Sequence, residues 1–249
     1  MLSNNVTVDK ILKGKISIIQ LKKGFRYGFD TVFLATFVNG YLKKLKKKKI
    51  SLVDVGSGVG TISLIIAYMN EEINITAIEN NESYIEIANE NIVRNNFQKK
   101  INLMKKDIFN IDNDLINRFD IVVTNPPFYD QQQKKSENEL DNYAKRISNY
   151  ESWIENSVKL LKDKGIIFLI IPTGLLEKSL KCLCKKTGSF KIFPIWPNKK
   201  KSSKRLILLG KKGGASPTEL MSGIRLFNNQ GNVTKKAKTY SDSGIFNFL

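Results

Sequence analysis

The chain has 249 residues, of which 41% are hydrophobic and 26% are charged. These values are typical of folded chains with a substantial core, and they exclude collagen-like, disordered and membrane-embedded classes. The absence of histidine excludes His-assisted catalytic triads, His-ligated zinc sites and histidine proton relays.

Two further features of the composition concern the cell compartment. Cys182 and Cys184 are too close in sequence to link distant segments, so we expect both to be reduced. The N-terminus lacks the pattern of a secretory signal, and no apolar run reaches about eighteen residues. We therefore expect a cytoplasmic protein without a membrane partner.

Helical and strand-like patterns alternate along the chain. The apolar spacing predicts helices at residues 30–46, 61–69, 82–95, 150–161 and 174–186. Short continuous apolar runs predict strands at residues 50–53, 74–78, 101–105, 119–124, 166–171, 190–195 and 205–210. Such strands belong to a mostly parallel sheet that is covered on both faces. The predicted fold class is therefore α/β, Rossmann-like and doubly wound, with a seven-stranded sheet.

The last predicted strand departs from simple alternation. Residues 196–204 are too few for a parallel crossover, so strand 205–210 is expected to run antiparallel to strand 190–195. The organisation we expect is an N-terminal segment at 1–29, a main domain at 30–210 and a C-terminal extension at 211–249. In that extension, a hairpin at residues 224–231 followed by a flexible tail is expected.

A glycine loop follows the predicted strand 50–53. Its residues are Asp54-Val55-Gly56-Ser57-Gly58-Val59-Gly60, and a predicted helix begins directly after it. In an α/β sheet, this position brings backbone amides and a helix N-terminus up to a ligand, and glycine lets the backbone come close. A tight turn without a ligand needs the same glycines, so the loop alone leaves both interpretations open.

Acidic residues after the first three strands favour a nucleoside ligand. Asp54 precedes the first glycine, where a carboxylate suits a cationic ligand terminus better than a pyrophosphate. Glu79 ends the second strand and is placed to accept hydrogen bonds from both hydroxyls of a ribose. Asp107 and Ile108 follow the third strand, where they are suited to hold the amino group and the face of an adenine.

With these residues in this order, residues 50–210 resemble the class I S-adenosylmethionine-dependent methyltransferases. The resemblance implies S-adenosylmethionine as the cofactor and places strand 205–210 between its two neighbours in the sheet. The implied cofactor contacts are Asp54, Gly56, Ser57, Gly58, Gly60, Glu79, Asn80, Asp107, Ile108 and Asn125.

Asn125-Pro126-Pro127-Phe128 at the end of strand 119–124 carries the sharpest chemical signal. An exocyclic or amide nitrogen is a poor nucleophile because its lone pair is delocalised. The Asn125 carboxamide oxygen and the Pro126 carbonyl are suited to accept its two hydrogens and favour a pyramidal, reactive nitrogen. Proline at 126 and 127 stiffens the loop, and Phe128 offers a ring for stacking a base. This loop also resembles enzymes that methylate adenine N6, cytosine N4, guanine N2 or glutamine amides.

Residues 20–35 precede the glycine loop and begin the first predicted helix, with Asp30 as its expected N-cap. The segment resembles that of the bacterial tRNA (adenine-N6) methyltransferases that modify valine tRNA beside the anticodon. Phe33-Leu34 stands where that group has a leucine pair. The resemblance implies that the segment closes over the cofactor, with contacts from Arg26, Phe29 and Asp30. The polar loop 129–146 is hypothesised to order over the substrate.

The formal net charge of +18 favours an RNA partner. Residues 181–212 contain many basic residues and no acidic one, and their lysine cluster follows strand 190–195. The expected RNA-binding residues are Lys199, Lys200, Lys201, Lys204 and Arg205. No metal is expected, and the oligomeric state is left open with a monomer favoured.

The favoured function is methyl transfer to N6 of an adenine in RNA, with tRNA near the anticodon as the favoured target. Two alternatives use the same loop chemistry: guanine-N2 methylation of ribosomal RNA and N5 methylation of a protein glutamine. The glutamine-modifying group more usually has tyrosine after the two prolines. A catalytically silent RNA-binding scaffold is a third alternative, against which the intact Asp54, Glu79, Asp107 and Asn125 argue.

Overall fold

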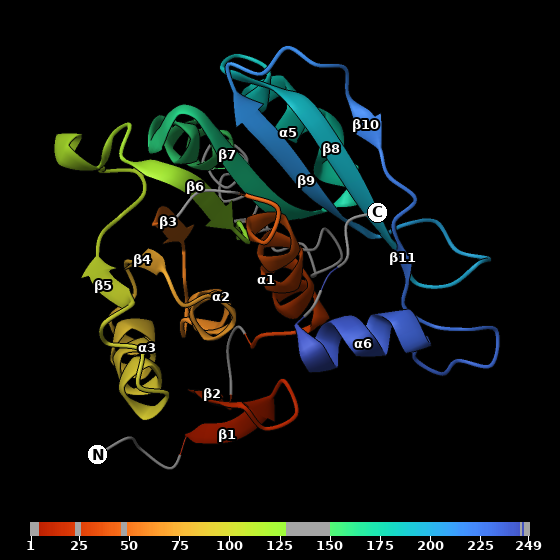
Figure 1. Ribbon diagram of the computed structural model, residues 1–249, viewed down its shortest axis with the longest axis horizontal. Helices are drawn as coiled ribbons and strands as arrows, with labels where there is room; N and C mark the ends of the chain where they lie inside the picture. The colour runs from red at the N-terminus through yellow and green to blue at the C-terminus, as the bar shows by residue number, and fades with distance from the viewer. Residues whose placement is uncertain (1–4, 23–25, 46–48, 128–149, 245, 247–249) are drawn as a thin grey trace, which may run out of the picture.

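The computed structural model describes residues 5–22, 26–45, 49–127, 150–244 and 246. A twisted β-sheet runs through the described part of the molecule (Figure 1). Its long strands are β3 (Ile50–Val55), β4 (Ile73–Glu79), β5 (Ile101–Lys105), β6 (Phe119–Thr124), β7 (Leu161–Pro172), β8 (Thr187–Trp196) and β9 (Arg205–Lys212). Two short strands, β10 (Glu219–Leu220) and β11 (Ile224–Arg225), also belong to the sheet. The strand order is β10-β8-β9-β7-β6-β3-β4-β5, and β11 also pairs with β8.

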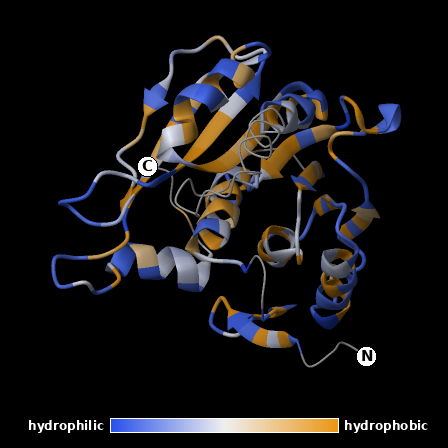
Figure 2. Cartoon of the chain, turned by 180° about the vertical axis from the view of Figure 1, so that it is seen from behind, coloured by the Kyte–Doolittle hydropathy of each residue, from blue (hydrophilic) through white to orange (hydrophobic). Residues whose placement is uncertain are grey.

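Helices cover both faces of this sheet, as the sequence predicts. One apolar core joins the sheet to α1 (Phe29–Leu42), α2 (Thr61–Met69) and α3 (Glu82–Arg94). A second core joins the opposite face to α5 (Leu176–Leu183) and to a helix that includes residues 150–159. Short 3-10 turns occur at η1 (Asn113–Leu115) and η2 (Thr173–Leu175). Figure 2 shows mainly apolar residues in the central strands and polar residues in the outer loops.

The direction of the last long strand is confirmed. β9 lies between β7 and β8 and is antiparallel to both. The sheet has nine strands among the described residues, but β10 (Glu219–Leu220) and β11 (Ile224–Arg225) have two residues each. Both pair with β8 in parallel. The seven longer strands therefore match the predicted sheet, and the two short ones extend it.

The N-terminus contains a hairpin that the sequence did not predict, formed by β1 (Val6–Ile11) and β2 (Ile16–Leu21). Two carboxamides, one on α3 and one at its C-cap, fasten β2 to the main domain. Asn91 accepts a hydrogen bond from the Ile19 amide at 2.7 Å and donates to the Ile19 carbonyl at 2.9 Å. Asn95 makes the same pair of bonds with Ser17, at 3.0 and 2.8 Å.

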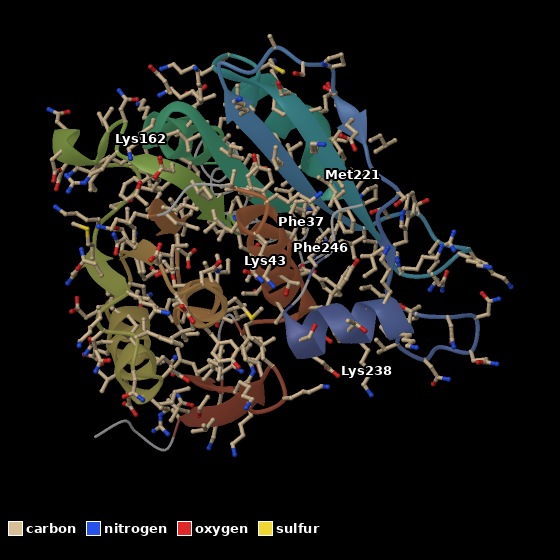
Figure 3. All side chains as sticks on the ribbon, in the orientation of Figure 1. Phe37, Lys43, Lys162, Met221, Lys238 and Phe246 are labelled. Atoms are coloured by element: carbon tan, nitrogen blue, oxygen red, sulfur yellow. The ribbon has the colours of Figure 1, made fainter. Side chains whose placement is uncertain are left out.

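The C-terminal extension is more ordered than the sequence predicted. Phe227 and Val233 form an isolated antiparallel bridge, whereas residues 224 and 225, expected to be part of a hairpin, pair in parallel with β8. The expected flexible tail is wrong for residues 235–243, because they form α6 (Lys235–Ser243) beside α1 (Figure 1). The Phe246 ring contacts the Phe37 ring at a centroid distance of 4.9 Å (Figure 3). The extension therefore completes the core over α1.

Other bounds differ from the predictions at element ends. α1 ends at Leu42, earlier than predicted, and mutual repulsion in the following lysine run disfavours its continuation. α5 is shorter than predicted because its start is replaced by η2. Within the described ranges, no helix combines the length and apolar character needed to cross a membrane.

Candidate functional site

The carboxyl ends of the parallel strands bring the glycine loop and the Asn-Pro-Pro segment together. Val55 at the end of β3 is the register partner of Thr124 at the end of β6. The next residue on each strand is Gly56 and Asn125, so these two positions are neighbours at one edge of the sheet. Neighbouring strands are about 4.8 Å apart, and this spacing sets the scale of the distance between the Gly56 and Asn125 backbones.

The glycine loop adopts a conformation that most residue types avoid. Gly56, Gly58 and Gly60 have φ angles of 70°, 56° and 86°. The Gly56 and Ser57 amides both donate to the Ile78 carbonyl, at 2.9 and 3.0 Å. Gly60 is the N-cap of α2, so the loop delivers the chain to a helix N-terminus as the sequence predicted.

Asp54 lies fully buried beneath this loop. Its Oδ2 accepts hydrogen bonds from the backbone amide and hydroxyl of Ser63, at 3.2 and 2.7 Å. Burial raises the pKa of Asp54 to about 7, although the Ser63 hydrogen bonds act in the opposite direction. Its Oδ1 has no hydrogen-bond partner among the described residues. The carboxylate therefore retains an unused acceptor at the site.

Glu79 is oriented by backbone amides. Its Oε1 accepts from the amides of Asn80 and Asn81, both at 2.9 Å, and its Oε2 accepts from the Gly58 amide at 2.8 Å. These bonds link the end of β4 to the glycine loop and fix the direction of the carboxylate. An ionised carboxyl group has about four acceptor positions, so capacity for a further donor remains.

Asp107 and Ile108 lie next to the end of β4, because Glu79 is the register partner of Lys105 on β5. Asp107 Oδ1 accepts from the Phe109 amide at 2.9 Å, and the Ile108 side chain is buried. The Ile108 carbonyl accepts from Asn156 Nδ2 at 3.0 Å. The two predicted adenine-binding residues therefore stand at the same edge as Glu79.

Unpaired polar atoms concentrate at this edge. Among the described residues, five buried side-chain oxygens lack a hydrogen-bond partner: those of Thr31, Asp54, Ser57, Thr61 and Asn125. Three of them belong to the glycine loop or the first residue of α2, and the fourth is Oδ1 of Asn125. Leaving a buried acceptor unpaired costs about 1–3 kcal/mol. This clustering indicates a site that a polar ligand completes.

Trp153 is a site residue that sequence reasoning missed. Its indole Nε1 donates to Thr124 Oγ1 at 3.0 Å, and Thr124 Oγ1 donates to the Val55 carbonyl at 2.9 Å. A Cβ on Gly56 would lie 2.7 Å from the Trp153 ring. The Phe109 ring lies edge-on to it at 6.0 Å. The residue occupies an ordinary position in an amphipathic helix, so its spacing gave no signal.

The three N-terminal residues predicted to contact a cofactor have other partners in this structure. The Arg26 guanidinium bonds to Asp9 Oδ2 at 2.9 Å and to Thr7 Oγ1 at 3.0 Å, both on β1. The Phe29 ring stacks on the next turn of its own helix and is 47% exposed. Asp30 Oδ2 accepts from Arg205 Nε at 2.9 Å. Arg205, predicted to bind RNA, therefore pairs with Asp30 at the start of α1.

The other predicted RNA-binding residues are exposed on the connection between β8 and β9. They are Lys199, Lys200, Lys201 and Lys204. β8 is antiparallel to β9, which is antiparallel to β7, so the connection leaves the same edge of the sheet as Asn125. Pro126 is buried and Pro127 is exposed there. Phe128 and the loop 129–146 lie outside the described residues.

Comparisons with known proteins identify the family. The model of the methyltransferase small domain family matches residues 38–192, which is more than half of the chain. The chain belongs to this family. S-adenosylmethionine is its cofactor, and the chain is an S-adenosylmethionine-dependent methyltransferase.

Two curated relatives are both named tRNA1(Val) (adenine(37)-N6)-methyltransferase. The protein from Flavobacterium psychrophilum is 27% identical over 184 residues, 73% of this chain and 74% of the relative. The protein from Flavobacteriaceae bacterium strain 3519-10 is 28% identical over 197 residues, 78% of this chain and 80% of the relative.

Solved structures share the fold of this methyltransferase. A protein from Agrobacterium tumefaciens described as a predicted O-methyltransferase superposes with a TM-score of 0.70 at 16% identity, covering 88% of this chain and 98% of its own. An S-adenosylmethionine-dependent O-methyltransferase from Thermotoga maritima gives a TM-score of 0.55 at 15% identity, covering 79% and 69%. The class I methyltransferase fold predicted from the sequence is confirmed.

The residues of the methyltransferase fit its cofactor. The unused Asp54 acceptor suits an ammonium group. The loop positions with positive φ angles are glycines, so no side chain covers the backbone there. The described residues contain no group of three or more Cys, Asp or Glu side chains placed to hold a metal ion.

Proposed function

We propose that this methyltransferase transfers the methyl group of S-adenosylmethionine to N6 of an adenine in RNA, with a tRNA adenine beside the anticodon as the favoured target. The names of the two curated relatives support the tRNA target. The Asn-Pro-Pro-Phe sequence and the basic composition agree with it. S-adenosylmethionine supplies a methyl group on a positively charged sulfur.

The unpaired Oδ1 of Asn125 is the observation that carries this proposal. It is a buried acceptor beside the glycine loop, and an adenine amino group is a donor with two hydrogens. Asn125 Oδ1 accepts one hydrogen, and the Pro126 carbonyl accepts the other. Both bonds favour the pyramidal nitrogen of the transition state over the planar ground state. Methyl transfer would leave S-adenosylhomocysteine as the second product, and one of the two amino protons would then leave to solvent, so that N6-methyladenosine keeps the other.

The proposed cofactor contacts follow from the same edge. Asp54 holds the amino end, and the loop residues Gly56, Ser57, Gly58 and Gly60 lie against the methionine portion. At the ribose, Glu79 accepts hydrogen bonds and Asn80 donates one. Asp107 and Ile108 bind the adenine ring. Within the chain, the link between Glu79 and the Gly58 amide supports a shared role for these two segments.

We further propose that residues 1–29 form a cover over the cofactor. Asn91 supports this proposal, because its Nδ2 donates to the Val59 carbonyl in the glycine loop at 3.0 Å and to Ile19 in the hairpin. Arg26 holds the hairpin through β1, and Phe29 and Asp30 stand where α1 begins. The hairpin and the glycine loop are therefore coupled through one side chain.

The test is incubation of the protein with methyl-labelled S-adenosylmethionine and separate tRNA, ribosomal RNA and protein fractions, followed by digestion to nucleosides or amino acids. We expect N6-methyladenosine from the tRNA fraction. Labelled guanosine from ribosomal RNA, or labelled glutamine, would replace the proposal with one of its two alternatives.

A variant tests the role of the carboxamide. Asn125→Ala is expected to keep cofactor affinity within a few fold of the wild type and to lower kcat by about a hundredfold or more. Asn125→Asp retains an acceptor oxygen, so its kcat is expected to fall less than that of Asn125→Ala. Equal losses in cofactor affinity and kcat would mean that Asn125 only supports the fold.

A further inference from the structure

A basic cavity of about 580 Å³ lies where the C-terminal extension meets the end of β8. Four cationic side chains line it: Lys199, Lys201, Arg225 and Lys236. The first two come from the connection after β8, whereas Arg225 and Lys236 come from the extension. The first pair belongs to the residues predicted from the sequence to bind RNA, whereas no role is predicted for the extension.

The backbone fixes the extension in this position. Arg225 is the register partner of Trp196, and the next amide, that of Leu226, donates to the Trp196 carbonyl at 2.8 Å. The Thr234 hydroxyl donates to the Arg225 carbonyl at 2.6 Å and accepts from the Ala237 amide, which caps α6. A Cβ on Gly223 would lie 2.1 Å from the Pro194 carbonyl, so β8 and the extension are in close contact. The cavity is therefore part of the fold.

The described part of the chain leaves the charges of the cavity uncompensated. None of its lining residues is acidic, and within the described ranges none of the four cations forms an ion pair. Lys236 lies 5.9 Å from the centre of the Tyr240 ring, which leaves its charge unneutralised. The first turn of α6 adds the positive end of a helix dipole. Several positive charges around one hollow attract a polyanion.

The cavity also stands at the edge of the sheet that carries Asn125. β8 and β6 are separated by β9 and β7 in the strand order, which is three interstrand spacings, or about 14 Å. An RNA chain bound in the cavity therefore remains within a few nucleotides of the methyl-transfer position.

We propose that this cavity binds phosphate groups of the RNA substrate, so that the C-terminal extension is an RNA-binding element. The proposal rests on the proposed function, because it takes RNA as the substrate. Arg225 contributes a planar guanidinium for a phosphate, and Lys199, Lys201 and Lys236 contribute point charges around it.

The experiment compares two double variants that remove the same charge. Arg225→Gln with Lys236→Gln removes both positive charges that the C-terminal extension contributes to the cavity. Lys235→Gln with Lys238→Gln removes two lysines of α6 outside the cavity, of which Lys238 points away from the sheet (Figure 3). Binding of a valine tRNA transcript is titrated by fluorescence anisotropy over a range of salt concentrations, without S-adenosylmethionine.

The cavity variant is expected to bind the transcript about tenfold more weakly. The slope of the logarithm of the binding constant against the logarithm of the salt concentration should become shallower by about 1.5. The control variant is expected to stay close to wild type. The charge-preserving change Arg225→Lys with Lys236→Arg should retain most of the affinity, which separates charge loss from misfolding. In methylation assays, the cavity variant should raise KM for tRNA and keep kcat.

Two results separate the possible failures. Equal binding and equal salt slopes for the cavity and control variants would overturn the proposal for the cavity. Normal wild-type binding without methylation of any tRNA adenine would overturn the proposed function alone, since the binding titration requires no chemistry.

Discussion

The indole of Trp153 donates a hydrogen bond to the hydroxyl of Thr124, the residue directly before Asn125. Thr124 in turn donates to the Val55 carbonyl, directly before Gly56 of the glycine loop. One chain of hydrogen bonds therefore joins the helix that includes residues 150–159 to the ends of β6 and β3. Trp153 is a positioning residue in this arrangement, because it acts on Asn125 through Thr124.

Trp153→Phe removes this hydrogen bond and keeps an aromatic ring at position 153, although the indole atoms next to Gly56 are lost. We expect the free energy of unfolding to fall by about 0.5–1.5 kcal/mol and kcat to fall by about tenfold or more, because a small displacement of a reacting group is costly. The control is Tyr150→Phe on the same helix, which removes the 2.6 Å bond to Ser179. Chemical denaturation and single-turnover methylation measure both effects. Similar turnover by the two variants would argue against positioning by Trp153.

The Gly56 conformation and its contact with Trp153 predict a second pair of variants. Gly56→Ala and Gly58→Ala both place a side chain at positive φ, which costs roughly 1 kcal/mol. A Cβ at Gly58 meets nothing within 4 Å, whereas a Cβ at Gly56 meets the indole ring. Gly56→Ala should therefore be the more destabilising change in thermal unfolding. Adding Trp153→Leu should relieve part of the extra destabilisation that Gly56→Ala causes relative to Gly58→Ala. Strict additivity of the Gly56 and Trp153 changes would contradict the steric explanation.

The elevated pKa of Asp54 predicts how stability depends on pH. Its ordinary value is 3.8, and burial raises it to about 7 in the folded chain. Between these values the folded state binds more protons than the unfolded state, so this group lowers stability as pH rises from about 4 to about 7. Asp54→Asn should remove that slope. Urea unfolding of the free protein at several pH values measures the difference, and parallel curves for both proteins would contradict it.

The same group predicts proton release on cofactor binding. A bound ammonium group favours the ionised form of Asp54, so binding near pH 6 should expel a proton and affinity should rise toward pH 7. Isothermal titration in buffers of different ionisation enthalpy measures this release. Asp54→Asn should show none, and equal release by both proteins would assign it to another group.

Asn91 on α3 and Asn95 at its C-cap provide a matched pair. Each bonds both backbone groups of a β2 residue, but only Asn91 also donates to Val59 in the glycine loop. Asn95→Ala should lower stability by about 1–3 kcal/mol and leave cofactor affinity unchanged. Asn91→Ala should lower both. The measurements are denaturant unfolding and equilibrium dialysis, and an equal cofactor affinity in the two variants would disprove the coupling.

Most of the sheet was predictable because its strands are continuous apolar runs flanked by glycine, proline and acidic residues. β5 and β6 were predicted with the observed bounds, and so was α2. The antiparallel β9 followed from a connection too short for a crossover. These features depend on local sequence. Local sequence is sufficient to predict a strand when all of its residues are buried.

The elements that were missed depend on distant contacts. α6 has a weakly apolar sequence, and it is held by α1, where Asn39 Nδ2 donates to the Gly244 carbonyl at 3.0 Å. The β1–β2 hairpin is held by Asn91 and Asn95, more than seventy residues away in sequence. In the site, the glycine loop and the acids were predictable from motifs. Trp153 and the partner of Arg205 were not, because a hydrogen-bond partner across the fold has no spacing signal.

The attachment of β2 to α3 has a consequence for self-association. The backbone groups of Ser17 and Ile19 that point away from β1 are those of a free strand edge, which in other proteins recruits a further strand and starts aggregation. Two carboxamides one helical turn apart occupy these groups in place of a neighbouring chain. α3 and its C-cap residue therefore prevent this strand edge from pairing with the strand of another molecule.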